Sequence, residues 1–219
     1  MSAGITVALI QHAAGGSAAQ AWARIEEGLR EARAQGADLA VLQELHNGPY
    51  FCQWENAAEF ARAEPIPGPS TERLGVLVCW DQWYPEAARL MTLAGADMLV
   101  YPTAIGFDPR DDDAEKARQK EAWELIQRAH AVANGIPVLA VNRCGHEPDP
   151  SEATPGITFW GGSFVCGAQG EWLARAGDTP GVLIARIATS RTEQTRQIWP
   201  FLRDRRIEAY ADLQKRYRD

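Results

Sequence analysis

The chain has 219 residues, of which 46% are hydrophobic and 23% charged, as in an ordinary globular protein with one sizeable domain. The net charge of −7 and the pI of about 5.2 argue against a nucleic-acid partner and fit a small cationic ligand. The longest apolar runs are only strand-sized and the first residues do not resemble a signal peptide, so we expect a cytoplasmic protein with no membrane span.

The first half of the chain alternates between strand and helix patterns, which predicts an α/β fold. Ser17 is a good N-cap for a helix, and Pro85 suits the first turn of another. The expected elements are strands over 5–11, 39–42 and 75–78, and helices over 18–35 and from 85 to about 95.

The second half continues the alternation and then becomes mainly β. A long helix should cover 114–134, after the acidic run 111–113, and end at Asn134-Gly135. Strands are expected over 98–102 and 138–142, and three short β segments between 160 and 187. The tail over 200–219 is predicted to be an arm rather than part of the core, and the whole of 1–219 a single domain.

One junction does not fit this pattern. Residues 67–74 carry the prolines, the Ser/Thr cap and the acidic residue of a helix start, yet 75–79 already have the pattern of a strand. A helix that ends within about one turn is not stable alone. The junction is either a tight irregular connection, or a segment that normally follows Leu74 is absent.

Glu44 and Cys79 each come directly after an apolar strand. The carboxyl ends of parallel strands converge on a crevice, where a carboxylate can act as base for a thiol nucleophile. The alternative is structural, because a lone cysteine is often a small buried hydrophobe and a glutamate after a strand is often a solvated turn residue. The four cysteines (Cys52, Cys79, Cys144, Cys166) have no metal-ligand spacing, so we expect free thiols and no metal.

Several motifs resemble the N-carbamoylputrescine amidases, a branch of the nitrilase superfamily of carbon–nitrogen hydrolases. The most specific is Cys79-Trp-Asp-Gln-Trp-Tyr-Pro-Glu-Ala-Ala-Arg89, which is similar to the segment that carries the nucleophile. The segments that resemble other parts of this branch are 39–45, 101–106, 108–113, 128–135, 141–143 and 199–206. The resemblance spans nearly the whole chain.

The resemblance implies a four-layer αββα sandwich that assembles into homo-oligomers and needs no cofactor. It implies that Cys79 attacks a carbamoyl or amide carbon, that Glu44 is the base, and that the Trp80 backbone N–H helps to hold the oxyanion. Substrate contacts would come from Tyr50, Trp80, Asp81 and Thr103.

The sequence departs from the family in one important respect. The third catalytic residue of the family is a lysine between the glutamate and the cysteine, but this chain has lysine only at 116, 120 and 215. The supporting second glutamate of that interval is missing too. These absences predict an internal deletion of several strands near 74–75, unless the protein contains residues that the sequence omits. Loss of a fixed cation beside the oxyanion could cost about 3–4 kcal/mol.

Two functional hypotheses follow. The first is hydrolysis of a carbamoylated amine, with N-carbamoylputrescine favoured because Asp81 and Gln82 stand where relatives that act on carbamoyl amino acids have arginines. Another carbamoyl or amide substrate is the variant of this hypothesis. The second is a catalytically inactive fragment that serves only as an oligomerisation or binding partner.

Overall fold

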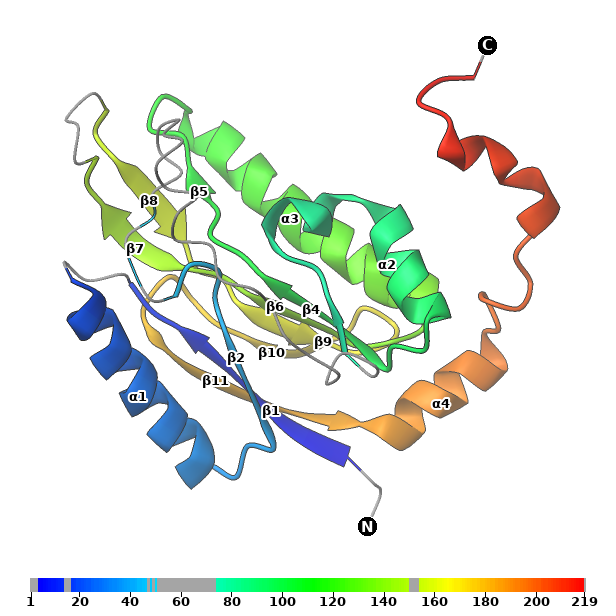
Figure 1. Cartoon of the computed structure of the whole chain (residues 1–219), viewed down its shortest axis with the longest axis horizontal. Helices are drawn as coiled ribbons and strands as arrows, with labels where there is room; N and C mark the ends of the chain where they lie inside the picture. Colours follow the sequence, from blue (N-terminus) through cyan, green and yellow to red (C-terminus); the bar gives the residue numbers. More distant parts are fainter. Residues whose placement is uncertain are drawn as a thin grey trace.

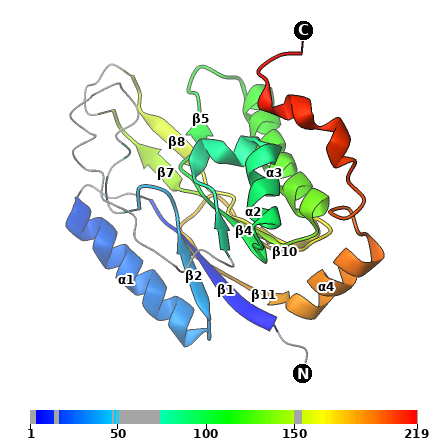
Figure 2. The same cartoon turned by 45° about the vertical axis from the view of Figure 1, so that its right-hand side comes forward.

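The computed structural model describes residues 4–13, 17–46, 48, 50, 74–149 and 154–218. Two sheets pack face to face, with one helix on the outer face of the first sheet and two helices on the outer face of the second (Figures 1 and 2). The predicted αββα sandwich is therefore confirmed. Within the described ranges, no helix is long and apolar enough to cross a membrane.

The first sheet has the order β11-β1-β2. Its strands are β1 (Gly4–Gln11), β2 (Leu39–Leu42), parallel to β1, and β11 (Gly181–Ala188), antiparallel to β1. Helix α1 (Ala18–Ala34) covers its outer face, and the Ser17 side chain accepts a hydrogen bond from the Gln20 N–H as the predicted N-cap.

The second sheet has the order β10-β9-β6-β4-β3. Its parallel strands are β3 (Leu74–Val76), β4 (Met98–Pro102) and β6 (Val138–Val141), and its antiparallel pair is β9 (Phe164–Cys166) and β10 (Trp172–Arg175). Helices α2 (Pro85–Leu93) and α3 (Asp113–Asn134) cover it. Gly135 ends α3 in the left-handed conformation, with φ of 62°, as glycine allows.

Strand β4 shows how the sequence builds two cores. Met98 and Val100 are buried between the two sheets, whereas Leu99 and Tyr101 are buried on the opposite face, under α2 and α3. Because successive side chains of a strand point to opposite faces, a strand covered on both sides must be apolar throughout. This requirement explains the uninterrupted run Met98–Tyr101.

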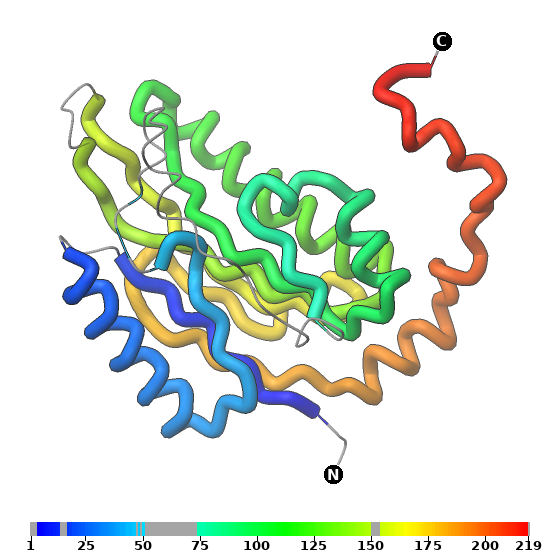
Figure 3. Tube along the Cα trace, in the orientation of Figure 1, coloured from blue at the N-terminus to red at the C-terminus, as the bar shows by residue number. Residues whose placement is uncertain are grey.

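Several elements were not predicted. They are the two-residue strand β5 (Gly106–Phe107), the hairpin of β7 (Cys144–Glu147) and β8 (Ile157–Trp160), and helix α4 (Thr189–Ile198). The hairpin and β5 form a separate small sheet of order β5-β8-β7. The arm after α4 has only the short 3₁₀ turns η5 (Ile207–Ala209) and η6 (Ala211–Gln214), and it runs away from the sandwich (Figure 3).

Strands β2 and β3 stand at the edges of their respective sheets. The predicted helix start over 67–74 lies outside the described residues except for Leu74, which begins β3. Among the described residues, β3 is the next strand after β2 along the chain. The predicted deletion point near 74–75 therefore coincides with the first residues of β3.

Candidate functional site

The site lies where the parallel strands end. In the second sheet, β3 leads to Cys79, β4 leads to Thr103, and β6 leads to Asn142 and Arg143. In the first sheet, β2 leads to Glu44. The structure thus gathers five polar side chains from both sheets at the carboxyl ends of their strands, which is where α/β sheets bind ligands.

Cys79 stands at a sharp change in chain direction. Its φ is 55°, a conformation that is uncommon and costly for any residue other than glycine, and the 3₁₀ helix η4 (Cys79–Trp83) starts there. Positive φ at a non-glycine residue concentrates at functional sites, where the surroundings hold the residue in place. Here the turn places the thiol beside the backbone N–H of Trp80.

The Cys79 thiol hydrogen-bonds the Glu44 carboxylate. Burial and the negative charge of Glu44 raise the pKa of the thiol to about 12, although the Trp80 N–H and Thr103 oppose this rise. A thiol with that pKa is ionised in only about one molecule in 10⁵ at pH 7. Cys79 can therefore act as a nucleophile at neutral pH only if a neighbouring base takes its proton during the attack.

Glu44 has the environment of such a base. One carboxylate oxygen accepts a hydrogen bond of 3.0 Å from the Ala104 backbone N–H. Burial raises the pKa of this carboxyl above its ordinary value, while Cys79, Ala104 and the positive charge of Arg143 limit the rise. A raised pKa brings a carboxylate nearer to the working range of a general base at neutral pH.

A buried hydrogen-bonded chain supports the thiol from the helix side. The indole N–H of Trp123 donates to Gln82 Oε1 at 2.7 Å, and Gln82 Nε2 donates to Thr103 Oγ1 at 3.2 Å. The Thr103 side chain in turn bonds Cys79. All three supporting side chains are almost fully buried, so their polar groups depend on one another.

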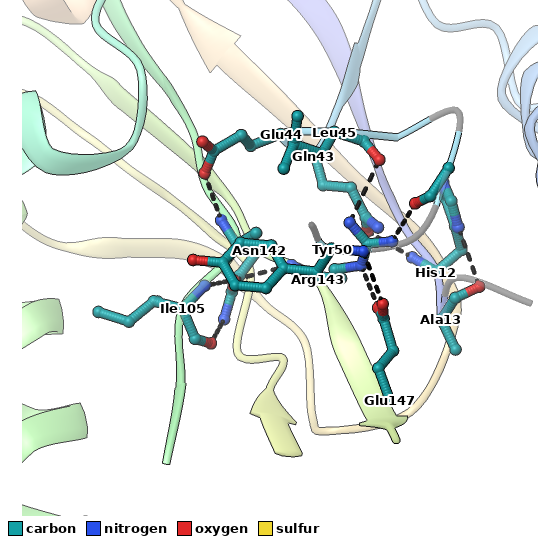
Figure 4. Close-up of polar contacts among 12 residues, drawn as sticks. His12, Ala13, Gln43, Glu44, Leu45, Tyr50, Ile105, Asn142, Arg143 and Glu147 are labelled. Atoms are coloured by element: carbon teal, nitrogen blue, oxygen red, sulfur yellow. Dashed lines mark hydrogen bonds and ion pairs between the residues drawn. The ribbon is translucent and has the colours of Figure 1, made fainter. Parts of the chain in front are cut away.

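Arg143 holds the turn that follows Glu44 (Figure 4). Its guanidinium donates to the backbone carbonyls of Leu45 at 3.2 Å and Gly48 at 2.5 Å. It also pairs with Glu147 at 2.5 Å, and the other Glu147 oxygen accepts the backbone N–H of Tyr50 at 2.9 Å. One fully buried arginine therefore ties three parts of this turn to the end of β6.

Of the four predicted substrate-contact residues, two belong to the bonded network of the site and two are exposed. Thr103 bonds the thiol, and Tyr50 lies in the Arg143 network with its ring edge-on to Phe159. The Trp80 ring is exposed and donates to the Tyr84 hydroxyl. Asp81 is also exposed. Its negative charge adds to the effect of burial in raising the pKa of the Tyr101 hydroxyl, and no described contact joins its carboxylate to Cys79. Whether these residues contact a substrate stays a prediction.

Among the described residues, the groups that most affect the Cys79 pKa include no lysine or arginine. Lys120 instead donates to the Trp160 carbonyl at 3.2 Å, and Lys116 lies near Asp108. Among the described residues, no group of three or more His, Cys, Asp or Glu side chains could hold a metal ion. The described cysteines Cys79, Cys144 and Cys166 are free thiols, while Cys52 lies outside the described residues.

Sequence reasoning missed the roles of Gln82, Asn142 and Arg143. All three are nearly or completely buried polar residues. A usable signal was present for the last two, because Asn142-Arg143 follows the wholly apolar strand Val138–Val141 just as Glu44 and Cys79 follow their strands. Polar residues at the end of every buried parallel strand of such a sheet are therefore candidates for its site.

Known proteins resemble this chain over most of its length. The N-carbamoylputrescine amidase of Solanum lycopersicum is 31% identical over 286 aligned positions, which cover 95% of this chain and 94% of the relative. The citrullinase of Francisella tularensis is 40% identical over 148 residues, 66% of this chain and 49% of the relative. The crystal structure of a carbon–nitrogen hydrolase from Helicobacter pylori superposes with a TM-score of 0.92 at 40% identity, covering 99% of this chain and 100% of that one.

The tomato alignment also bears on chain length. Because 95% of 219 residues is about 208 residues, about 78 of the 286 aligned positions have no residue of this chain opposite them. The position of that gap near 74–75 remains a prediction from the sequence. The family model "Carbon-nitrogen hydrolase" matches residues 62–197, well over half of the chain. Together with the relatives and the fold, this match shows that the chain belongs to the carbon–nitrogen hydrolase family.

Proposed function

We propose that this chain hydrolyses the carbon–nitrogen bond of a carbamoylated amine, with N-carbamoylputrescine as the favoured substrate. The observation that carries the proposal is the hydrogen bond between the Cys79 thiol and the buried Glu44 carboxylate at the convergent strand ends. A thiol paired with a carboxylate of raised pKa is a nucleophile with its base already in place.

The proposed reaction has two stages. In the first, the Cys79 sulfur attacks the carbamoyl carbon while Glu44 takes the thiol proton and passes it to the departing nitrogen, so that ammonia or the amine leaves. In the second, Glu44 takes a proton from water while the hydroxide attacks the same carbon, and it returns that proton to the Cys79 sulfur as the carbon–sulfur bond breaks. The carbamic acid that is released then breaks down into carbon dioxide and the remaining nitrogen product, so the final products are the free amine, carbon dioxide and ammonia. The Trp80 backbone N–H is the candidate donor to the oxyanion in both stages.

The charges around the site favour a cationic substrate. Glu44 is anionic when it acts as a base, and the nearby Arg143 is already paired with Glu147. The first arginine after Cys79 is Arg89, which lines a groove of about 590 Å³ with Arg128 and Phe201, against α3 and the C-terminal arm. A substrate carboxylate would thus meet no free arginine from this segment, whereas an ammonium would be attracted.

The substrate proposal can be tested by comparing N-carbamoylputrescine with N-carbamoyl-alanine and citrulline, the last because a citrullinase is among the relatives. Release of amine from each should be measured with the purified chain and with its Cys79→Ser variant. We expect Cys79-dependent release to be fastest with the diamine. Faster release from either carboxylate substrate would contradict the proposed specificity.

The second candidate is a binding or assembly partner without useful activity. Two features favour it. No described lysine or arginine is among the main groups that lower the Cys79 pKa. Apolar side chains of α4 and of the arm that follows it are exposed. The exposed set includes Ile198, Trp199, Phe201, Ile207 and Leu213. Trp199 and Phe201 stack on each other within this set, and exposed apolar side chains gathered in one segment are typical of an interaction site, so under either candidate we expect a homo-oligomer. Light scattering after gel filtration should give a mass well above 24.1 kDa, and a monomer would contradict the expectation.

A further inference from the structure

The position of Glu44 depends on groups outside the proposed nucleophile–base pair. Glu44 itself lies at the end of β2, and the chain then turns away through Leu45, where φ is 51°. A non-glycine residue in the left-handed region is strained and persists only where its surroundings hold it. The contacts that hold this turn come from the other sheet.

Arg143 supplies most of these contacts. Its donation to the Leu45 and Gly48 carbonyls fixes both ends of the short turn, and its pair with Glu147 reaches Tyr50 as well. In Figure 4 the guanidinium lies between the Leu45 carbonyl and the Glu147 carboxylate. The planar fork of arginine can serve several acceptors at once, which a lysine ammonium does less well.

The neighbouring Asn142 holds the other side of the base. Its Oδ1 accepts the Ile105 N–H at 2.9 Å, and its Nδ2 donates to the Ile105 carbonyl at 3.0 Å. This clamp fixes the loop in which the Ala104 N–H donates to Glu44. The dipeptide Asn142-Arg143 therefore reaches both the turn after Glu44 and the donor to its carboxylate.

We propose that Arg143 is a positioning residue for Glu44, which holds the turn after the base and places a fixed positive charge beside its carboxylate. The inference rests on the proposed function, because it assigns a role with respect to the proposed base. Arg143 itself need not touch the substrate. Its expected effects are on the pH at which Glu44 becomes an effective base and on the rate that the base then supports.

The readout is alkylation of Cys79 by iodoacetamide, followed by peptide mass spectrometry between about pH 4 and 9. It requires no amidase turnover. Since the thiol pKa is about 12, alkylation in this range should depend on proton acceptance by Glu44 and rise as Glu44 ionises. Other titratable groups are near: Glu147 and Tyr50 face Arg143, and the pKa values of His12 and His46 are lowered in part by its charge. Glu44→Gln identifies the part of the profile that belongs to Glu44.

The variants separate charge from folding. Removing either partner alone would strand the buried charge of the other, so the main comparison is the parent against Arg143→Met/Glu147→Gln, in which the glutamine can still accept from Tyr50. We expect the double variant to shift the rise to higher pH and to lower the plateau rate by up to about 100-fold, the effect of a misplaced catalytic group. Arg143→Lys, which keeps the charge and loses the fork, should leave the midpoint in place and lower the plateau.

The matched control is Arg175→Met/Glu124→Gln. It removes another arginine–glutamate pair, at 2.6 Å between β10 and α3, in which the glutamate is buried and the arginine half-exposed, and it should leave the profile unchanged. A parent-like midpoint and plateau in Arg143→Met/Glu147→Gln would overturn the proposal. It would also be overturned if the two substitutions shifted the alkylation midpoint equally in a protein that already carries Glu44→Gln. If the double variant does not fold, Arg143→Lys decides: a lower plateau supports the proposal, and a parent-like plateau overturns it.

The same experiment tests the proposed function separately. If Glu44→Gln leaves the alkylation profile unchanged, Glu44 is not the base, and both the proposed mechanism and the role of Arg143 fall. If Glu44→Gln removes the rise but the Arg143 variants behave like their controls, only the positioning role falls.

Discussion

Protonation of His130 should destabilise the fold as the pH falls from about 6.5 to about 4. The ring is 2% exposed, and its Nδ1 lies 2.8 Å from the buried Tyr101 hydroxyl. Burial lowers the pKa of His130 to about 4, with a small opposing effect of Glu86. In the unfolded chain the pKa is about 6.5, so the unfolded state binds more protons than the folded state within this interval. The free energy of unfolding must therefore decrease as the pH is lowered.

The size of the effect follows from the two pKa values. A difference of about 2.5 pKa units corresponds to roughly 3 kcal/mol in total, of which about 2–2.5 kcal/mol is lost between pH 7 and pH 4.5. His130→Gln retains a polar partner for Tyr101 but cannot titrate, so this share of the pH dependence should vanish.

Urea unfolding at several pH values measures the effect. The difference in unfolding free energy between the parent and His130→Gln should shrink by about 2 kcal/mol on going from pH 7 to pH 4.5. His146→Gln, which makes the same substitution at an exposed position, is the control. Parallel pH curves for the parent and His130→Gln would refute the reasoning that His130 is held neutral by burial.

Three further substitutions test local features. Cys79→Gly should be at least as stable as Cys79→Ala in thermal unfolding, although glycine ordinarily costs about 0.5–1 kcal/mol, because the φ of 55° strains alanine; a clearly less stable glycine variant would contradict the strain. Trp123→Phe leaves Gln82 Oε1 without its donor and should cost about 1–3 kcal/mol by urea unfolding; a neutral effect would mean that the chain to Thr103 is not structural. Ser17→Ala removes the cap that accepts from Gln20 and should cost about 1 kcal/mol, whereas no change in unfolding free energy would show the cap to be frayed.

The regular elements were predictable because their signals are local. The strand Met98–Pro102 has the predicted bounds, and the predicted helix over 114–134 differs from α3 by one residue at its start. The missed elements lack such signals. The hairpin of β7 and β8 contains Gly145, His146 and a proline-rich connection, and its strands form by pairing with each other and with β5 rather than by an apolar pattern of their own.

The site was only partly predictable for a related reason. Strand ends mark Glu44 and Cys79 from the sequence, and the resemblance names their roles. The sequence does not reveal that Arg143 crosses between sheets to hold Gly48, because that contact joins residues 95 positions apart. Nor does the sequence reveal that the Asp81 charge helps to raise the pKa of Tyr101, since the direction of a side chain within the 3₁₀ helix η4 depends on tertiary packing.

The central claim is that the chain carries a thiol–carboxylate hydrolase site that lacks the family's lysine. The most direct test is the rate of putrescine release from N-carbamoylputrescine by purified protein whose intact mass matches the 24.1 kDa of the sequence, beside its Cys79→Ser variant. The account predicts release that depends on Cys79 and stays below the usual enzymatic range of roughly 1–10³ per second, because the sequence has no lysine between Glu44 and Cys79 to assist the oxyanion. A rate within that range from protein of this mass would contradict the need for the lysine, and equal release by Cys79→Ser would contradict the site itself.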